Sequence, residues 1–246
     1  MKTFRADLHI HTVLSPCGSL EMSPESVMLH AKARGIDILG ITDHNSTRNC
    51  KVYQRIGQKH GIQVLTGVEV NTREEIHALA FFESESELNT FQEYLDEHLP
   101  FVANNTDIFG YQVVIDDDEG IVDQIDALLI NALDVSIDEV SEYVKQLNGI
   151  FIPAHINRQV SSVISQLGFV PPNLQYDALG ISRHITKENF LKKNAYLNDK
   201  TFIQNSDAHF VEDIGRVYTL FHMTDSSFEE IRKALHNIDG RHCEIL

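Results

Sequence analysis

The segment Asp7-Leu8-His9-Ile10-His11-Thr12, residues 7–12, ends an apolar stretch that starts at Lys2 and that we expect to form a β-strand. Side chains two positions apart on a strand point to the same face, so the imidazoles of His9 and His11 can reach one ion. The same spacing returns late in the chain, where Asp207 and His209 follow the apolar segment 202–205. The two pairs predict a metal site built where strands end.

Strands and helices alternate between these two pairs. Ser23-Pro24-Glu25 has the capping serine, early proline and acid of a helix start, and Gly35 ends that helix. Capping boxes that begin at Ser136 and Ser226 predict two later helix starts. About seven strand–helix units in one chain favour a parallel barrel over an open sheet. We therefore expect a single domain over residues 1–246, with helices at 24–34, 49–60 and 86–98 and strands at 36–42, 62–69, 76–82, 150–153, 178–182 and 202–205.

Residues 100–133 interrupt this rhythm and are expected to form an insertion in the barrel. The segment contains an apolar strand at 111–115, followed by the acidic turn 116–120. The turn lacks the ligand spacing of a calcium-binding loop, so it is interpreted as a solvated turn.

The composition limits the function classes. The net charge of −16 repels nucleic acid at long range, so we expect no general nucleic-acid surface. Bound cations would dominate the local field of a metal site, so a small phosphorylated substrate remains compatible with that charge. No apolar run approaches the roughly 18 residues of a membrane span. Three scattered cysteines are no disulfide framework, and we expect a cytoplasmic protein without a membrane partner.

Further potential ligands occupy strand ends. His44, Glu69, His77 and His155 each lie in or just after a predicted strand. The carboxyl ends of parallel strands meet on one face of a barrel, where barrel active sites are built. So many buried polar groups would be costly without metal coordination. The remaining histidines in helices or near the chain ends are interpreted as packed or surface residues: His30, His60, His98, His222, His236 and His242.

These segments resemble the motifs of the PHP (polymerase and histidinol phosphatase) family. The matching segments appear in order along most of the chain: Asp7–Thr12, Thr42–Asn45, Gly67–Glu69, Glu75–His77, Pro153–His155 and Ser206–His209. The resemblance implies a distorted (β/α)7 barrel and a stand-alone, metal-dependent phosphoesterase.

The resemblance also implies two or three divalent ions, commonly zinc, manganese or iron. His9, His11, Glu69 and Asp207 would hold one ion. Glu69 would bridge to a second ion that His77 and His155 also hold. His44 and His209 would hold a third.

One position departs from the family pattern. Members often carry an aspartate or histidine a few residues after the first motif, whereas this chain has Val13-Leu14-Ser15-Pro16-Cys17-Gly18-Ser19. Cys17 is the one good ligand there, because a thiolate binds zinc or iron well. The alternative is an unliganded cysteine in a tight turn.

Four other residues have predicted supporting roles. Asp7 and Asp43 adjoin ligand histidines, and we expect them to orient imidazoles rather than to bind metal. Arg158 can fork onto a phosphate, or it can form a surface salt bridge. His184 can act as a general acid, or it can be an ordinary loop histidine.

Three function classes follow from the sequence. The first is a phosphoesterase that cleaves a small phosphorylated metabolite or nucleotide with a metal-activated water. The second is an amidohydrolase-type metal hydrolase, which does not explain His44, Glu69 and the Asp207–His209 pair together. The third is a non-catalytic metal-binding PHP module.

Overall fold

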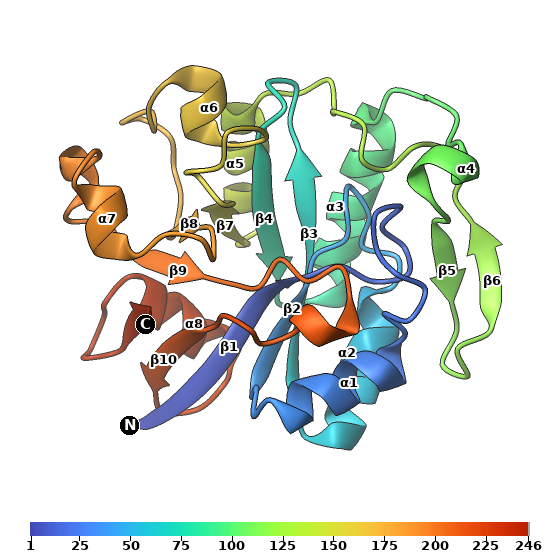
Figure 1. Ribbon diagram of the computed structural model, residues 1–246, viewed down its shortest axis with the longest axis horizontal. Helices are drawn as coiled ribbons and strands as arrows, with labels where there is room; N and C mark the ends of the chain where they lie inside the picture. Colours follow the sequence, from blue (N-terminus) through green and yellow to red (C-terminus); the bar gives the residue numbers. More distant parts are fainter. Residues whose placement is uncertain (246) are drawn as a thin grey trace.

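The computed structural model of the protein describes residues 1–245 and contains a curled seven-stranded sheet (Figure 1). The order of the strands is β11-β10-β1-β2-β3-β4-β7. Their bounds are β1 (Lys2–Ile10), β2 (Ile38–Ile41), β3 (Gln63–Asn71), β4 (His77–Phe82), β7 (Ile150–Pro153), β10 (Thr219–Met223) and β11 (His242–Ile245). Two short parallel strands, β8 (Leu179–Ile181) and β9 (Phe202–Gln204), form a separate sheet. The predicted α/β class is confirmed, and in place of the expected (β/α)7 barrel the protein has this curled seven-stranded sheet.

The regular parallel alternation expected of a (β/α)7 barrel is interrupted at β4, and also at the other edge, where β10 runs antiparallel to both β1 and β11. Strand β4 runs antiparallel to both β3 and β7, and Asn71 pairs with His77. A connection this short can form only a hairpin, because parallel neighbours need a crossover of a dozen or more residues. The start of β4 therefore lies beside the end of β3. This reversal puts His77 at the same end of the sheet as the carboxyl ends of the parallel strands.

Most of the larger helices cover the outer face of the sheet, whereas the last helix packs on the opposite face through Phe228, Ile231 and Leu235 (Figure 1). The bounds of the helices are α1 (Pro24–Ala33), α2 (Cys50–His60), α3 (Glu85–His98), α5 (Ile137–Gln146) and α8 (Phe228–Leu235), with the short helices α4 (Thr106–Phe109), α6 (Val163–Leu167) and α7 (Lys187–Leu191) and the 3-10 turns η1 (Ala195–Leu197) and η2 (Val211–Asp213). The predicted capping box at Ser136 is confirmed. The capping box predicted at Ser226 is wrong. The cap of α8 is Ser227, one residue later, whose side chain accepts from the Glu230 amide, and the Glu230 carboxylate accepts from the Thr224 amide.

The segment predicted as an insertion forms a small ribbon of its own. Strands β5 (Val113–Ile115) and β6 (Ile121–Gln124) pair antiparallel, apart from the main sheet. In Figure 1 they lie with α4 beyond the helical layer. The segment that follows β6 is bound to the loop after β2 by Asn45, whose side-chain amide donates to the carbonyls of Leu129 and Asn131.

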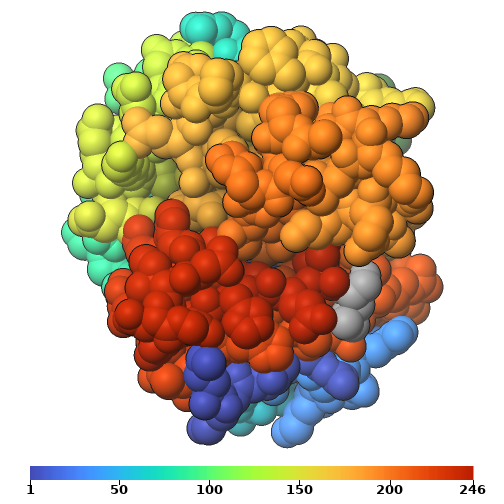
Figure 2. Space-filling model, turned by 90° about the vertical axis from the view of Figure 1, so that its left-hand side faces the viewer, coloured from blue at the N-terminus to red at the C-terminus, as the bar shows by residue number. Residues whose placement is uncertain are grey.

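Two hydrophobic clusters lie on the two faces of the sheet. One includes Leu8, Leu65 and Ile152, and the other includes Ile10 and Leu39 under the helices. Both ends of the described chain lie on one side, where β10 pairs with β1 and β11 (Figures 1 and 2). No helix among residues 1–245 is long and apolar enough to cross a membrane.

Candidate metal centre

An irregularity in β1 helps to deliver the first two histidines. Leu8 belongs to one hydrophobic cluster and Ile10 to the other, and the register of β1 against β2 shifts between Asp7 and Ile10. A shift of this kind re-aims side chains at the end of a strand. The Nε2 atoms of His9 and His11 consequently lie 3.2 Å apart, facing one another.

Glu69, in β3, is the centre of the cluster. Its Oε1 lies 3.1 Å from His9 Nε2, 3.1 Å from His77 Nδ1 and 3.2 Å from His155 Nε2. Its Oε2 lies 3.3 Å from both His11 Nε2 and His44 Nδ1. The side chain is only 1% exposed. One buried carboxylate thus faces five imidazoles from β1, β4 and the ends of β2 and β7.

The protonation of Glu69, His44 and His155 suits metal binding. Burial would lower the pKa of His9 and His11, but Glu69 and Asp207 raise it, so a bound cation must displace a proton from these two rings. Burial alone would raise the pKa of Glu69, but His9 and His77 outweigh burial and hold that pKa well below its usual value. Burial lowers the pKa of His155 and, more strongly, that of His44, so both imidazoles are neutral near pH 7. A carboxyl or imidazole group must lose its proton to bind a metal ion.

Two buried histidine ring nitrogens lack a hydrogen-bond partner within residues 1–245. Nδ1 of His44 is buried and has no hydrogen-bond partner among the described residues, although Glu69 lies nearby. Nδ1 of His155 is likewise buried without a partner there. A buried polar atom without a partner costs free energy, and a cation beside His44 and Glu69 would remove that cost at Nδ1 of His44. The residues present therefore fit a metal ion.

Asp207 completes the inner group from the loop after β9. Its Oδ1 lies 3.4 Å from His9 Nε2 and 3.5 Å from His11 Nε2. Burial would raise the pKa of Asp207, but His9 and His11 hold it well below its usual value. Arg158 donates to Oδ2 at 3.0 Å, so it lies at the mouth of the site with a salt bridge to a candidate ligand.

A second group forms beside the first. Ligand atoms of His11, Cys17, His44 and His209 all lie within 4.8 Å of one another. Burial lowers the pKa of His209 to about 4. Desolvation by its neighbours raises the pKa of the Cys17 thiol to about 11, although part of this residue is exposed at the surface. Cys17 is therefore a thiol at neutral pH unless a cation displaces its proton. The structure brings Cys17 to the predicted position, and its role as a ligand stays a prediction.

Asp43 acts on the histidines through a residue that the sequence did not single out. Its carboxylate accepts hydrogen bonds from Thr12 Oγ1 and Ser15 Oγ, both at 2.6 Å. Ser15 Oγ lies 2.9 Å from His11 Nδ1 and accepts from the His44 amide at 3.2 Å. Ser15 thus links Asp43 to two candidate ligands. No motif spacing marks Ser15, because the link depends on how the loop after β1 folds back.

Asp7 has a different role from the one expected. Its carboxylate accepts from the backbone amides of Ser206 at 3.0 Å and Gly215 at 2.9 Å, and it contacts no imidazole ring nitrogen by a hydrogen bond within residues 1–245. Burial raises the pKa of Asp7 to about 6. Asp7 therefore fixes the loop that carries Asp207, because that loop passes directly over β1.

Backbone strain marks the same loops. His155 (φ 29°), Asp207 (φ 55°) and Asn45 (φ 44°) all have positive φ, which is uncommon for histidine and better tolerated by Asp and Asn; six other non-glycine residues of the described chain share it. Such conformations persist where the surroundings enforce them, often at functional sites. Two of the three residues are candidate ligands, and the third adjoins His44.

The cluster opens into a pocket of about 490 Å³. His184 and Arg158 line it, so the structure brings both predicted residues to the site. Arg183 and Phe210 line it too, and the sequence analysis missed them. Phe210 directly follows His209, but a single aromatic residue carries no functional signal in a sequence.

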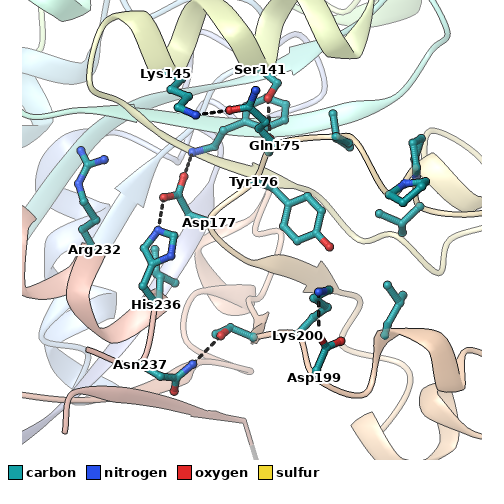
Figure 3. A pocket seen from close by; sticks show the side chains of 18 of the residues that line it. Ser141, Lys145, Gln175, Tyr176, Asp177, Asp199, Lys200, Arg232, His236 and Asn237 are labelled. Carbon is teal, nitrogen blue, oxygen red and sulfur yellow. Dashed lines mark hydrogen bonds and ion pairs between the residues drawn. The ribbon is translucent and has the colours of Figure 1, made fainter. Parts of the chain in front are cut away.

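A pocket of about 1250 Å³ lies elsewhere, lined by residues that precede β7, β8 and β9 (Figure 3). Its polar groups mostly bond each other, as in the pairs Asp177–His236 and Asp199–Lys200. Within residues 1–245, the groups of three or more metal-ligating side chains all lie at the smaller pocket. Metal chemistry therefore belongs to the smaller pocket.

Comparison with known families agrees with this geometry. The model of the PHP domain matches residues 7–156, and that of the PHP-associated region matches residues 192–238. The uncharacterized protein MJ1587 of Methanocaldococcus jannaschii is 35% identical over 79 residues, which are 28% of this chain and 46% of that protein. The chain therefore spans about half the length of this relative.

Two solved structures share the fold. The lesion-specific endonuclease EndoQ of Pyrococcus furiosus matches with a TM-score of 0.71 and 21% identity, over 98% of this chain and 58% of its own. A putative metal-dependent phosphoesterase of Bifidobacterium adolescentis matches with a TM-score of 0.56 and 20% identity, over 95% of this chain and 96% of its own.

One prediction is overturned by these comparisons. Endonuclease Q has also been solved in complex with a 27-mer duplex substrate that carries an abasic lesion at the active site, and that chain matches over 98% of ours. The expectation of a small phosphorylated substrate, with no nucleic-acid surface, is therefore wrong. The net charge misled because it averages over the whole chain, whereas Arg158 and Arg183 gather at the site.

Proposed function

The chain belongs to the PHP domain family of metal-dependent hydrolases, and we propose that it hydrolyses phosphodiester bonds in nucleic acid. The observation that carries this proposal is the contact of five imidazoles with both oxygens of Glu69. A single carboxylate cannot accept a hydrogen bond from each of them. Two cations held through Glu69 would use four of these rings as ligands, and the fifth, His44, also adjoins the position proposed for a third ion.

The family resemblance supplies the ligand sets, and the close grouping of His9, His11 and Glu69 supports the first of them. His9, His11, Glu69 and Asp207 would hold one ion, and His77 and His155 would hold a second with Glu69. His11 and His44 also adjoin Cys17 and His209, where a third ion would bind. Zinc, manganese and iron all accept such ligands. When bound, the ions would supply a water of lowered pKa and neutralise charge on a phosphoryl group.

The protein's own groups account for the remaining chemistry. Asp43 and Ser15 hold His11 in one orientation, and Asp7 holds the loop of Asp207. Arg158 lies 3.0 Å from Asp207 and can turn its free guanidinium nitrogens to a phosphate oxygen. His184 lines the same pocket and would protonate a leaving oxygen.

A nucleic acid as substrate is supported by the fold shared with endonuclease Q and by the arginines of the pocket. Arginine binds phosphate through two parallel hydrogen bonds, which suits a backbone diester.

The test is hydrolysis of bis(p-nitrophenyl) phosphate and of a fluorescent oligonucleotide by the purified protein. We expect both activities to stop after chelation and to return with manganese, zinc or iron. Full hydrolysis by protein shown to be metal-free would refute the proposal.

A further inference from the structure

A second hollow continues from the metal pocket. It has a volume of about 430 Å³ and shares Arg183 and His184 with the pocket of about 490 Å³. It extends past Gln204 to Arg216 and Tyr218, at the start of β10. The two hollows together form a groove that leaves the metal cluster over Arg183 and His184.

Away from the metal cluster, the groove carries more arginine than carboxylate, although the protein is strongly acidic. Arg158, Arg183, His184 and Arg216 line it, while the whole chain carries a net charge of −16. Of the carboxylates in the metal pocket, Glu69 and Asp207 belong to the metal cluster. No carboxylate lines the second hollow within the described residues.

Asp213 is the remaining carboxylate of the groove. It lies 2.6 Å from Arg216 and 3.6 Å from Arg183, so one acid serves two guanidinium groups. Both arginines therefore keep donors for a second anion. The side chain of Arg216 is 53% exposed, so a ligand can reach it.

Two aromatic rings lie along the same groove. Phe210 lines the metal pocket and is 54% exposed, although burial of that ring would be favourable. Tyr218 lines the second hollow, and the guanidinium of Arg5 lies 5.3 Å from its ring centroid. A cationic groove with aromatic platforms is the arrangement by which proteins bind single-stranded nucleic acid.

Resting on the phosphodiesterase function proposed above, we infer that this groove binds the unpaired strand next to the scissile phosphate. Arg183 and Arg216 bind its backbone, and Phe210 and Tyr218 stack its bases. A hollow of about 430 Å³ is near the lower end of the roughly 300–1000 Å³ typical of small-ligand pockets, which suits one unpaired nucleotide rather than a base pair. Stacking also requires a free base face.

The test separates binding from hydrolysis. Fluorescence anisotropy measures the affinity of chelator-treated protein for a labelled 12-nucleotide single strand and for the matching blunt duplex. We expect tighter binding of the single strand. Arg216→Ala and Tyr218→Leu should each weaken it about tenfold, as expected for one phosphate contact or one stacked base. Tyr218→Phe keeps the ring and should bind like the wild type.

The salt dependence of binding distinguishes a phosphate contact by Arg216 from base stacking by Tyr218. Arg216→Ala should lower the slope of log affinity against log salt by about 0.7, whereas Tyr218→Leu should leave it unchanged. Arg55→Ala, which removes an exposed arginine paired with Asp117, is the matched control and should bind normally.

Unchanged binding by both groove variants, or tighter binding of the duplex, would overturn the inference whatever the hydrolytic activity. Lack of hydrolysis in metal-loaded wild-type protein that binds through the groove would instead refute the proposed function and leave the inference standing.

Discussion

His155 Nε2 lies 3.2 Å from Oε1 of Glu69, although 86 positions separate the two residues in the chain. Glu69 comes from β3 and His155 follows β7, and the antiparallel strand β4 lies between them in the sheet. Because β4 is antiparallel to both neighbours, β3 and β7 run in the same direction and their carboxyl ends lie on one side. The reversal of β4 adds His77, which is the first residue of that strand. The order and direction of the strands thus explain why these ligands meet at one end of the sheet.

Replacing Glu69 with alanine should abolish hydrolysis and reduce the bound metal. Because the carboxylate faces the candidate ligands of two ions, its loss should lower kcat by about a hundredfold or more. His155→Ala should act similarly on one ion. Steady-state kinetics and elemental analysis measure both effects, with the exposed Glu142→Ala as control. Wild-type kinetics in Glu69→Ala would show that Glu69 is no bridge.

Replacing Ser15 with alanine should weaken metal binding without removing a ligand. Its hydroxyl links Asp43 to His11, and loss of such an outer contact typically costs about tenfold or more in metal affinity. Competition with a chelating dye measures that affinity. Ser84→Ala removes the cap of α3 instead, and should cost about 1 kcal/mol of stability with no change in metal affinity. Equal metal affinities in the two variants would argue against a positioning role.

Replacing Cys17 tests the second group of ligands. Cys17→Ser should weaken the third ion and leave the ions at Glu69 bound, because Cys17 adjoins only His11, His44 and His209. Cys17→Asp should shift the preference from zinc toward manganese, a harder ion. Metal content and metal-dependent activity are the measurements. The same stoichiometry and preference in all three proteins would leave Cys17 as a turn residue.

The pH dependence of stability should change on replacing Glu230 with glutamine. Hydrogen bonds from Arg241 and Thr224 lower the pKa of Glu230 from 4.5 to about 2. The folded-state pKa lies below the unfolded one, so this carboxylate stabilises the fold above about pH 4.5 and the contribution is lost as the pH falls toward 2. Urea denaturation should therefore show Glu230→Gln to be less stable at pH 7, with a smaller deficit at pH 3.5. A deficit independent of pH, or one shared by Glu229→Gln, would count against this assignment.

Much of the site could be predicted because its signals are local. The pairs His9–His11 and Asp207–His209 follow strands, and the structure brings all nine predicted ligand residues to one cluster. The expected helices at 24–34, 49–60 and 86–98 match α1, α2 and α3 within about two residues.

What could not be predicted depends on contacts between distant segments. The hairpin of β3 and β4 was expected as two parallel strands, because the apolar pattern of a strand does not encode its direction. Ser15 and Arg183 join the site through loop conformation, and the role of Asp7 became visible only when the 206–215 loop lay above it. The net charge of the whole chain gives no sign of the arginines along the groove, because a sum does not show where charges lie. In the groove, Arg183 and Arg216 share one carboxylate, that of Asp213.

The most direct test of the account is the metal content of the purified protein, measured by elemental analysis of material prepared without chelator. The account predicts at least two transition-metal ions per chain, and fewer in Glu69→Ala. One ion or none per chain, in protein that is folded and fully active, would contradict it.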